Sequence, residues 1–306
     1  MNSPSPEIER TIELGFTPYA SGMLQRVGGK GSRGPVVHQG GTTWRATRTD
    51  LGPATLAITA KKHAVHVAGW GAGAEAAADD VPDLLGASDE PHLLEPKDPL
   101  VARLVITKPD YRMTRTNSIW EHVITTILGQ KVPVASAAAS WQGMLKRWGE
   151  APPGSPPHQL RLGPSAEVIA QLAYHDLHLV NVEKKRADIV LTSAKRVFRL
   201  EEALTMTPRD ARTRLEAIRG IGPWTSSIVT QLAFGDPDAV ITGDYNIPAM
   251  IAWNFAGERT ADDDRMLELL EPYAGQRARV QNLVKFGGSK PPRHGPRLSL
   301  TDLAGR

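Results

Sequence analysis

The sequence of 306 residues contains no cysteine. This absence excludes disulfides, zinc–thiolate sites, iron–sulfur clusters and thiol nucleophiles. No run approaches the roughly 18 consecutive apolar residues of a membrane-spanning helix, so no membrane partner is expected. The first ten residues are polar and lack the apolar segment of a signal peptide, which favours a reduced, cytoplasmic location.

The net charge of the chain is also small. Lysine and arginine number 36 and the acidic residues 33, which leaves a formal charge of +3. The bases are unevenly placed, since residues 184–199 carry six bases and one acid, and residues 277–306 carry seven bases and one acid. Such stretches suit contact with a polyanion, although solvated helix faces explain them equally well. The length suggests about two domains.

The first 100 residues show the alternation of β-strands. Residues 55–60 and 63–68 each alternate in polarity around Lys61 and Lys62, which predicts a hairpin of half-buried strands. Residues 90–99 contain three prolines and no clear period, as a linker does. We therefore expect a small, β-rich α+β domain over residues 1–100.

Helical spacing begins at residue 117. Ile119, Val123 and Ile127 fall on one stripe of a buried helix, and residues 134–148 form a second helix rich in small side chains. These patterns predict a mainly α-helical domain over residues 101–290 and a basic, proline-rich tail over residues 291–306. Further helices are expected over residues 166–175, 183–198, 208–217, 224–234, 246–256, 262–272 and 276–286.

Two glycines, Gly220 and Gly222, separate two of these helices, and Pro223 follows at the start of the second. We expect both glycines to allow a tight reversal with positive φ, and Ile221 between them to plug into the core. The amides of the turn and of the next helix, together with the Thr225 hydroxyl, would then form a phosphate site. A plain connection between helices is the alternative.

Asp244 stands 22 residues beyond Gly222, after an apolar run over residues 239–241 and just before a predicted helix. One helix and one loop separate the two positions, so the carboxylate should return to the neighbourhood of the hairpin. An aspartate here is also a good helix N-cap, worth about 1 kcal/mol. On these residues alone the cap is the favoured explanation of Asp244.

Taken together, the hairpin, the apolar run and Asp244 resemble the helix-hairpin-helix (HhH-GPD) DNA glycosylase superfamily. Upstream, residues 127–133 read Ile-Leu-Gly-Gln-Lys-Val-Pro. They resemble the Ile-Leu-Gly-Gln-x-Val-Ser segment of its alkyladenine branch, the 3-methyladenine DNA glycosylase II-like enzymes. The order of elements agrees over roughly residues 36–286.

The resemblance implies a monofunctional DNA glycosylase. Such an enzyme flips a damaged base, here an alkylated purine, out of double-stranded DNA and hydrolyses its glycosidic bond, which initiates base excision repair. The resemblance implies that Asp244 is the catalytic carboxylate and that Trp224, Tyr245 and Trp120 line the base pocket. Trp224 also stands where bifunctional relatives carry the lysine that forms a Schiff base, so no lyase activity is expected.

DNA contacts follow from the same resemblance. It assigns Gly220, Gly222 and Thr225 to the phosphate and places Gln130 and Lys131 in the minor groove at the lesion. The branch usually has an apolar wedge where Lys131 stands, so the sequence leaves open which of the two fills the gap in the duplex. No cofactor is implied beyond a monovalent cation at the main-chain carbonyls of three residues, namely Glu216, Ile218 and Ile221.

Two other functions stay open. One is a glycosylase for deaminated or mismatched bases, because Ile228 stands where the branch has a second pocket aromatic and residues 283–285 supply none. The other is a non-catalytic damage-binding protein, which would have no reason to keep a carboxylate beside the phosphate backbone. We expect a monomer that acts on damaged double-stranded DNA in the cytoplasm, at the nucleoid if the chain is bacterial.

Overall fold

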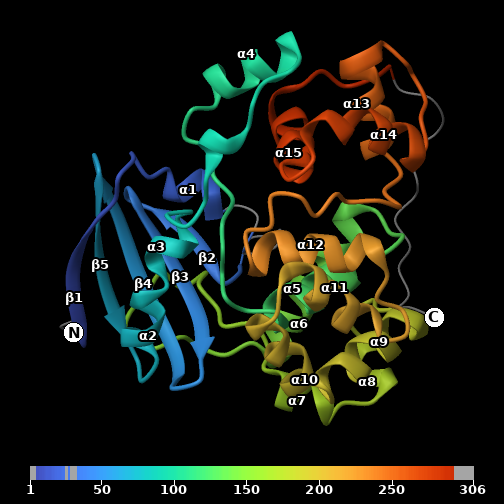
Figure 1. Cartoon of the computed structure of the whole chain (residues 1–306). Helices are drawn as coiled ribbons and strands as arrows, with labels where there is room; N and C mark the ends of the chain where they lie inside the picture. Colours follow the sequence, from blue (N-terminus) through green and yellow to red (C-terminus); the bar gives the residue numbers. More distant parts are fainter. Residues whose placement is uncertain (1–4, 25–26, 28–32, 293–306) are drawn as a thin grey trace.

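The computed structural model describes residues 5–24, 27 and 33–292. Apart from its first two residues, the tail expected over residues 291–306 lies outside this range. Figure 1 shows a β-sheet on one side of the molecule and a larger group of helices on the other. The chain therefore has the expected α+β architecture, while the domain limits at residues 100 and 290 stay a prediction. Within the described residues no helix combines the length and apolarity needed to cross a membrane.

Five antiparallel strands form the sheet, in the order β1-β5-β4-β3-β2. The predicted hairpin is confirmed: Lys61 pairs with Ala64, and the register places Ile58 opposite Val67 on the buried face. Alternation over residues 8–13 also makes a strand, which the sequence analysis did not predict. The strands are β1 (Ile8–Glu13), β2 (Val36–Gln39), β3 (Thr42–Thr49), β4 (Gly52–Lys61) and β5 (Ala64–Trp70).

Short helices cover one face of the sheet. They are α1 (Ala20–Met23), α2 (Ala74–Asp79) and α3 (Val81–Leu84), and α2 packs on β4 and β5. The core beneath them ends at Leu85, and the next buried apolar residue, Leu94, packs with the helices at the far end of the chain. The linker region therefore joins the helical part before residue 100.

Over the described residues the helical part contains twelve α-helices. One of them, α4, was not predicted, although Asp98 caps it by accepting a hydrogen bond from the Leu100 amide at 2.7 Å. The helices are α4 (Pro99–Thr107), α5 (Trp120–Leu128), α6 (Val134–Trp148), α7 (Ala166–Ala170), α8 (Tyr174–His178), α9 (Lys184–Ala194), α10 (Val197–Glu201), α11 (Pro208–Glu216), α12 (Pro223–Ala233), α13 (Ile247–Ala256), α14 (Asp263–Leu270) and α15 (Arg277–Gly287).

Two of the predictions are wrong, because each predicted helix is two separate helices in the structure. Over residues 166–175 the break has a local cause, because the Asp176 carboxylate accepts a hydrogen bond from the Ala173 amide at 2.8 Å and so starts a new helix, α8. Over residues 183–198 the chain leaves helical geometry at Arg196, with φ −118° and ψ 17°, between α9 and α10.

Helix α12, which lies in the middle of the helical part in Figure 1, packs into two separate apolar cores. Val229 and Ala233 pack into a core shared with α5, α6, α9 and α11. Trp224 and Ile228, on another face of the same helix, pack against the core of α4, α13, α14 and α15. The start of α12 therefore stands where the two halves of the helical part meet.

Candidate functional site: the hairpin and the Asp244 loop

Helices α11 and α12 form the predicted hairpin. Leu215, Ile218 and Ile221 are all buried, so the expectation that Ile221 plugs into the core is confirmed. The two glycines differ, however. Gly220 has φ 101°, but Gly222 is extended at φ −119° and ψ −174°, so the expectation of positive φ is wrong for Gly222.

The surroundings of the glycines explain what each one does. A Cβ on Gly220 would lie 2.4 Å from the Ile189 Cδ1 atom of α9, whereas a Cβ on Gly222 would meet nothing within 4 Å. In the described part of the chain no backbone acceptor is recorded for the amides of Gly222 and Trp224. Gly222 thus leaves open space in front of free amides at a helix N-terminus, which is the geometry that binds a phosphate.

Gly220→Ala is expected to destabilise the folded protein, while Gly222→Ala should have little effect. A side chain at Gly220 would combine an unfavourable φ, which costs about 1–3 kcal/mol, with the contact against Ile189. Urea unfolding of the two variants measures the difference directly. Equal midpoints for the two would contradict the distinction drawn between the glycines.

Thr225 and Gln130 are bound to each other. The Thr225 side chain is only 1% exposed, and its hydroxyl accepts a hydrogen bond from Gln130 Nε2 at 2.9 Å. The prediction that Thr225 contacts DNA is therefore wrong, because the hydroxyl is buried inside the hairpin. Gln130 Nε2 also donates to the Gly220 carbonyl at 3.0 Å, so this side chain spans two turns. Lys131 is exposed and has φ 54°.

Asp244 follows Gly243, which has φ 74° and turns the chain toward α13. The carboxylate atom Oδ1 accepts hydrogen bonds from the amides of Asn246 at 2.8 Å and Ile247 at 3.1 Å. The other oxygen, Oδ2, accepts one from Trp224 Nε1 at 3.2 Å. Both hypotheses about Asp244 are thus compatible with the structure: the carboxylate caps the start of α13 and also lies beside the hairpin.

Trp224 is half-buried between the three predicted motifs. A Cβ on Gly129 would lie 3.5 Å from Trp224 Cη2, and one on Gly243 would lie 3.8 Å from Trp224 Cβ. The end of α5, the start of α12 and the Asp244 loop therefore meet around this indole. Tyr245 is 92% exposed beside Asp244, so it stands at the surface of the site.

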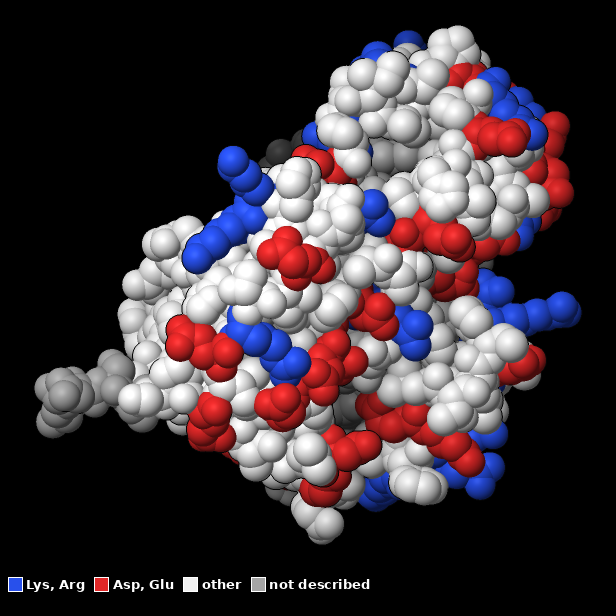
Figure 2. Space-filling view, turned by 60° about the vertical axis from the view of Figure 1, so that its left-hand side comes forward, with Lys and Arg blue, Asp and Glu red and all other residues white. Residues whose placement is uncertain are grey.

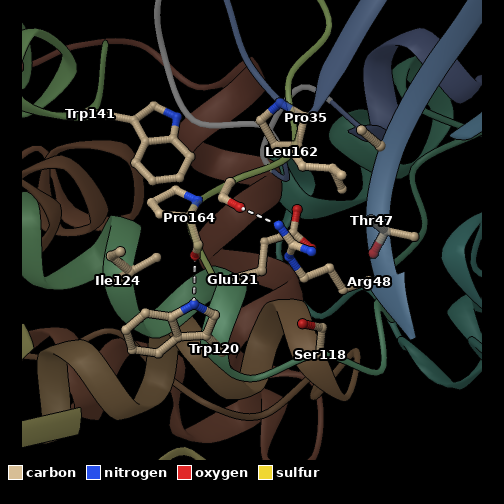
Figure 3. A pocket seen from close by; sticks show the side chains of 12 residues that line it. Pro35, Thr47, Arg48, Ser118, Trp120, Glu121, Ile124, Trp141, Leu162 and Pro164 are labelled. Atoms are coloured by element: carbon tan, nitrogen blue, oxygen red, sulfur yellow. Dashed lines mark hydrogen bonds between the residues drawn. The ribbon is translucent and has the colours of Figure 1, made fainter. Parts of the chain in front are cut away.

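Trp120 lies elsewhere, which makes its assignment to the base pocket wrong. It stands at the first residue of α5, and about 13 Å of helix separates it from the end that meets Trp224. Trp120 lines a cavity between the sheet and the helices together with Trp141 and Thr47 (Figure 3), and the volume of this cavity is about 60 Å³. Its indole Nε1 donates to the Pro164 carbonyl at 3.0 Å, a core contact.

Two residues that sequence reasoning missed hold this site in place. Asp263 Oδ2 accepts a hydrogen bond from the Gly243 amide at 2.7 Å and so orients the turn before Asp244. Asp262, its neighbour, caps α14. Arg186 of α9 is buried and donates to the Leu128 carbonyl at 2.7 Å, so this base is structural and does not face a polyanion. Neither contact has a local sequence signal.

The carbonyls named for a monovalent cation are compatible with one. Among the described residues no backbone amide donates to the carbonyls of Glu216 and Ile221, and the Ile218 carbonyl accepts one bond, from the Ile221 amide at 2.9 Å. Each carbonyl therefore keeps at least one lone pair. In the same part of the chain no group of three or more His, Asp or Glu side chains could hold a metal ion.

Figure 2 shows one face of the molecule, on which many acidic side chains are exposed among several lysines and arginines. A groove between the sheet and α10 is lined by five acidic residues and two arginines, namely Asp50, Asp80, Glu167, Glu201, Glu202, Arg45 and Arg48. Such a surface repels a polyanion.

Known proteins share this fold and part of the sequence. No protein-family model matches the chain. The Bacillus subtilis protein YfjP, named as a putative DNA-3-methyladenine glycosylase, is 25% identical to this chain over 163 residues. These residues are 51% of this chain and 55% of YfjP. Against the curated relatives named AlkA, from Mycobacterium tuberculosis, the match covers 30% of the relative. The chain thus spans about half the length of YfjP and less of the AlkA proteins.

Solved structures match over most of the chain. The 3-methyladenine DNA glycosylase of Archaeoglobus fulgidus has a TM-score of 0.71 at 18% identity, covering 90% of this chain and 97% of that one. A Clostridium acetobutylicum 8-oxoguanine glycosylase/lyase bound to double-stranded DNA has a TM-score of 0.60 at 11% identity, covering 81% and 95%. The chain is thus similar in fold to solved DNA glycosylases and, over about half of its length, similar in sequence to proteins named as 3-methyladenine DNA glycosylase or AlkA.

Proposed function

We propose that this protein is a monofunctional DNA glycosylase that excises alkylated purine bases from double-stranded DNA and so initiates base excision repair. One observation carries the proposal. The Asp244 carboxylate is held against the Trp224 indole at the start of the hairpin's second helix, where free amides can bind a DNA phosphate. Phosphate site, aromatic surface and carboxylate thus lie at one place.

Binding starts at the hairpin. The open amides of Gly222 and Trp224 grip one phosphate without reading the bases. The target nucleotide then leaves the stack, at a cost of a few kcal/mol that is smallest for damaged bases. An alkylated purine carries positive charge, and an indole face attracts cations by about 0.5–2 kcal/mol. The exposed side of Trp224 and the neighbouring Tyr245 are the aromatic surfaces that receive it.

Catalysis is assigned to Asp244. Cleavage of the glycosidic bond develops positive charge on the sugar, which a fixed carboxylate stabilises electrostatically. Amides of Asn246 and Ile247 and the Trp224 indole occupy three of the roughly four acceptor positions of this carboxylate. They hold it in one orientation and leave one position for the sugar or for the attacking water.

Hydrolysis without strand cleavage follows from Trp224. The indole has no amine with which to form a Schiff base at this position of the hairpin. We further propose that the carbonyls of Glu216, Ile218 and Ile221 bind a monovalent cation, which would add positive charge beside the bound phosphate. No step of the hydrolysis uses that ion.

Duplex DNA treated with a methylating agent tests the proposal. The expected result is release of free 3-methyladenine or 7-methylguanine, identified by mass spectrometry, with strand cleavage only after heat and alkali. Release from uracil, hypoxanthine or mismatched duplexes alone would move the substrate class to deaminated or mismatched bases. Tight binding with no release from any duplex would overturn the enzyme and favour a damage-binding protein. Trapping of the protein on DNA by borohydride would contradict the monofunctional mechanism.

A further inference from the structure

The turn after α5 and the hairpin are joined by one side chain, Gln130. Its Nε2 atom donates to the Gly220 carbonyl at 3.0 Å and to the Thr225 hydroxyl at 2.9 Å. The two acceptors lie on either side of Gly222, one in the hairpin turn and one in the first turn of α12. Because an amide nitrogen has two hydrogens, both bonds can form together, and the donor capacity of Gln130 is then fully used inside the protein.

Helix α9 contacts both the turn after α5 and the hairpin turn at Gly220. Arg186 donates to the carbonyl of Leu128, the last residue of α5, at 2.7 Å. One helical turn further along, Ile189 fills the space beside Gly220, where no Cβ could fit. The contacts therefore form a closed ring, from α9 to the end of α5, through Gln130 to the hairpin, and from the hairpin back to α9.

Lys131 is the residue that this ring leaves pointing outward. It follows Gln130 directly, has φ 54°, and is exposed. Among the described residues no ion pair involves its ammonium group. A left-handed conformation is unfavourable for a lysine and persists only where the surroundings impose it. Its neighbour Gln130, tied to the hairpin, supplies that constraint.

We infer that Gln130 is a positioning residue that couples the hairpin to the turn after α5, and that Lys131 is the cation this turn presents to the DNA backbone. The inference deepens the proposed function and rests on it for the DNA contact. Gln130 then acts on DNA through the hairpin, while Lys131 acts by charge. The two neighbours should fail in different ways when replaced.

Three variants separate these roles: Gln130→Met, Thr225→Val and Lys131→Met. Affinity is measured by fluorescence anisotropy on a duplex containing an abasic-site analogue, across a series of salt concentrations. Gln130→Met removes both hydrogen bonds to the hairpin and is expected to weaken binding about fivefold, as a net loss of about 1 kcal/mol does, with an unchanged salt slope. Lys131→Met should reduce the slope of log K against log salt by about 0.9, because one phosphate contact is lost.

Coupling between Gln130 and Thr225 gives the sharpest readout. The double variant Gln130→Met/Thr225→Val is expected to bind no more weakly than Gln130→Met alone. The reason is that Gln130→Met already removes the Gln130–Thr225 hydrogen bond that Thr225→Val removes. Gln130→Met/Lys131→Met should instead show the product of the two single effects. Multiplicative losses for Gln130 and Thr225 would overturn the bridge and make Gln130 a direct DNA contact.

The DNA-free protein provides an independent test. In amide NMR spectra, Gln130→Met is expected to shift the resonances of Gly220 and Gly222, while Lys131→Met leaves them in place. Unmoved hairpin resonances in Gln130→Met would refute the coupling. If the wild type binds no duplex at all, the proposed function fails and with it the role of Lys131, while these spectra still decide whether the bridge exists.

Discussion

Asp244→Asn is expected to slow base excision by about 10²–10³-fold, the loss that removal of one preorganised electrostatic contact produces. DNA binding should stay nearly unchanged, because the hairpin amides that hold the phosphate are untouched. Asparagine keeps the oxygen that accepts from the amides of Asn246 and Ile247. It loses the negative charge, and its amino group would face the Trp224 N–H as a second donor.

Single-turnover rates on a lesion-containing duplex measure the chemical step, and anisotropy measures binding separately. Asp262→Asn is the matched control, because Asp262 also caps a helix by accepting from a backbone amide, that of Arg265 at 3.0 Å. It should retain full excision. A rate for Asp244→Asn within tenfold of the wild type, or an equal loss in Asp262→Asn, would reduce Asp244 to a structural cap.

The largest effect on stability is expected at a buried ion pair outside this site. Arg279 of α15 is 2% exposed and Asp89 5% exposed, and the two are joined by two hydrogen bonds, one of them from Nη1 to Oδ2 at 3.0 Å. Asp89 Oδ2 also accepts from the Met113 amide at 2.9 Å. The pair thus fastens the segment after the N-terminal core to the last helix.

Arg279→Met is expected to lower the free energy of unfolding by about 3–5 kcal/mol, because it leaves the Asp89 charge buried without a partner. Replacing both residues by apolar ones should recover part of that loss, since no uncompensated charge remains. Urea unfolding followed by tryptophan fluorescence measures both variants. Arg265→Met, which removes half-exposed ion pairs with Glu258 and Glu268, is the control and should shift the midpoint much less. An unchanged midpoint in Arg279→Met would show that the pair does not hold these segments together.

Local patterns predicted much of this fold. Alternation located the β4–β5 hairpin, helical spacing located most helices, and the Gly220–Pro223 segment located the hairpin. These features depend on residues within one or two turns of each other, where spacing determines which side chains share a face. The same reasoning lost accuracy where a single side chain interrupts a pattern, as Asp176 does when it starts α8.

The site residues show the same difference between what local sequence predicts and what tertiary packing decides. Asp244 and Trp224 were named from the sequence and do lie in contact, and their catalytic and pocket roles stay predictions. Trp120 had an aromatic side chain suited to a base pocket, yet its indole is bound to Pro164 in the core. Nothing in its neighbourhood along the chain distinguishes these outcomes, because burial depends on what the rest of the fold brings against a helix.

By itself, then, the sequence determined the classes of element, the glycine turn and the carboxylate that follows it, because backbone conformation and amphipathic spacing are local properties. Only the tertiary structure decided that Thr225 is buried, that Arg186 supports a turn, and that Gln130 bridges two of them. The Gln130–Thr225 bond joins residues 95 apart and the Arg186–Leu128 bond residues 58 apart. A polar side chain at such a distance finds its partner only when packing brings the two elements together.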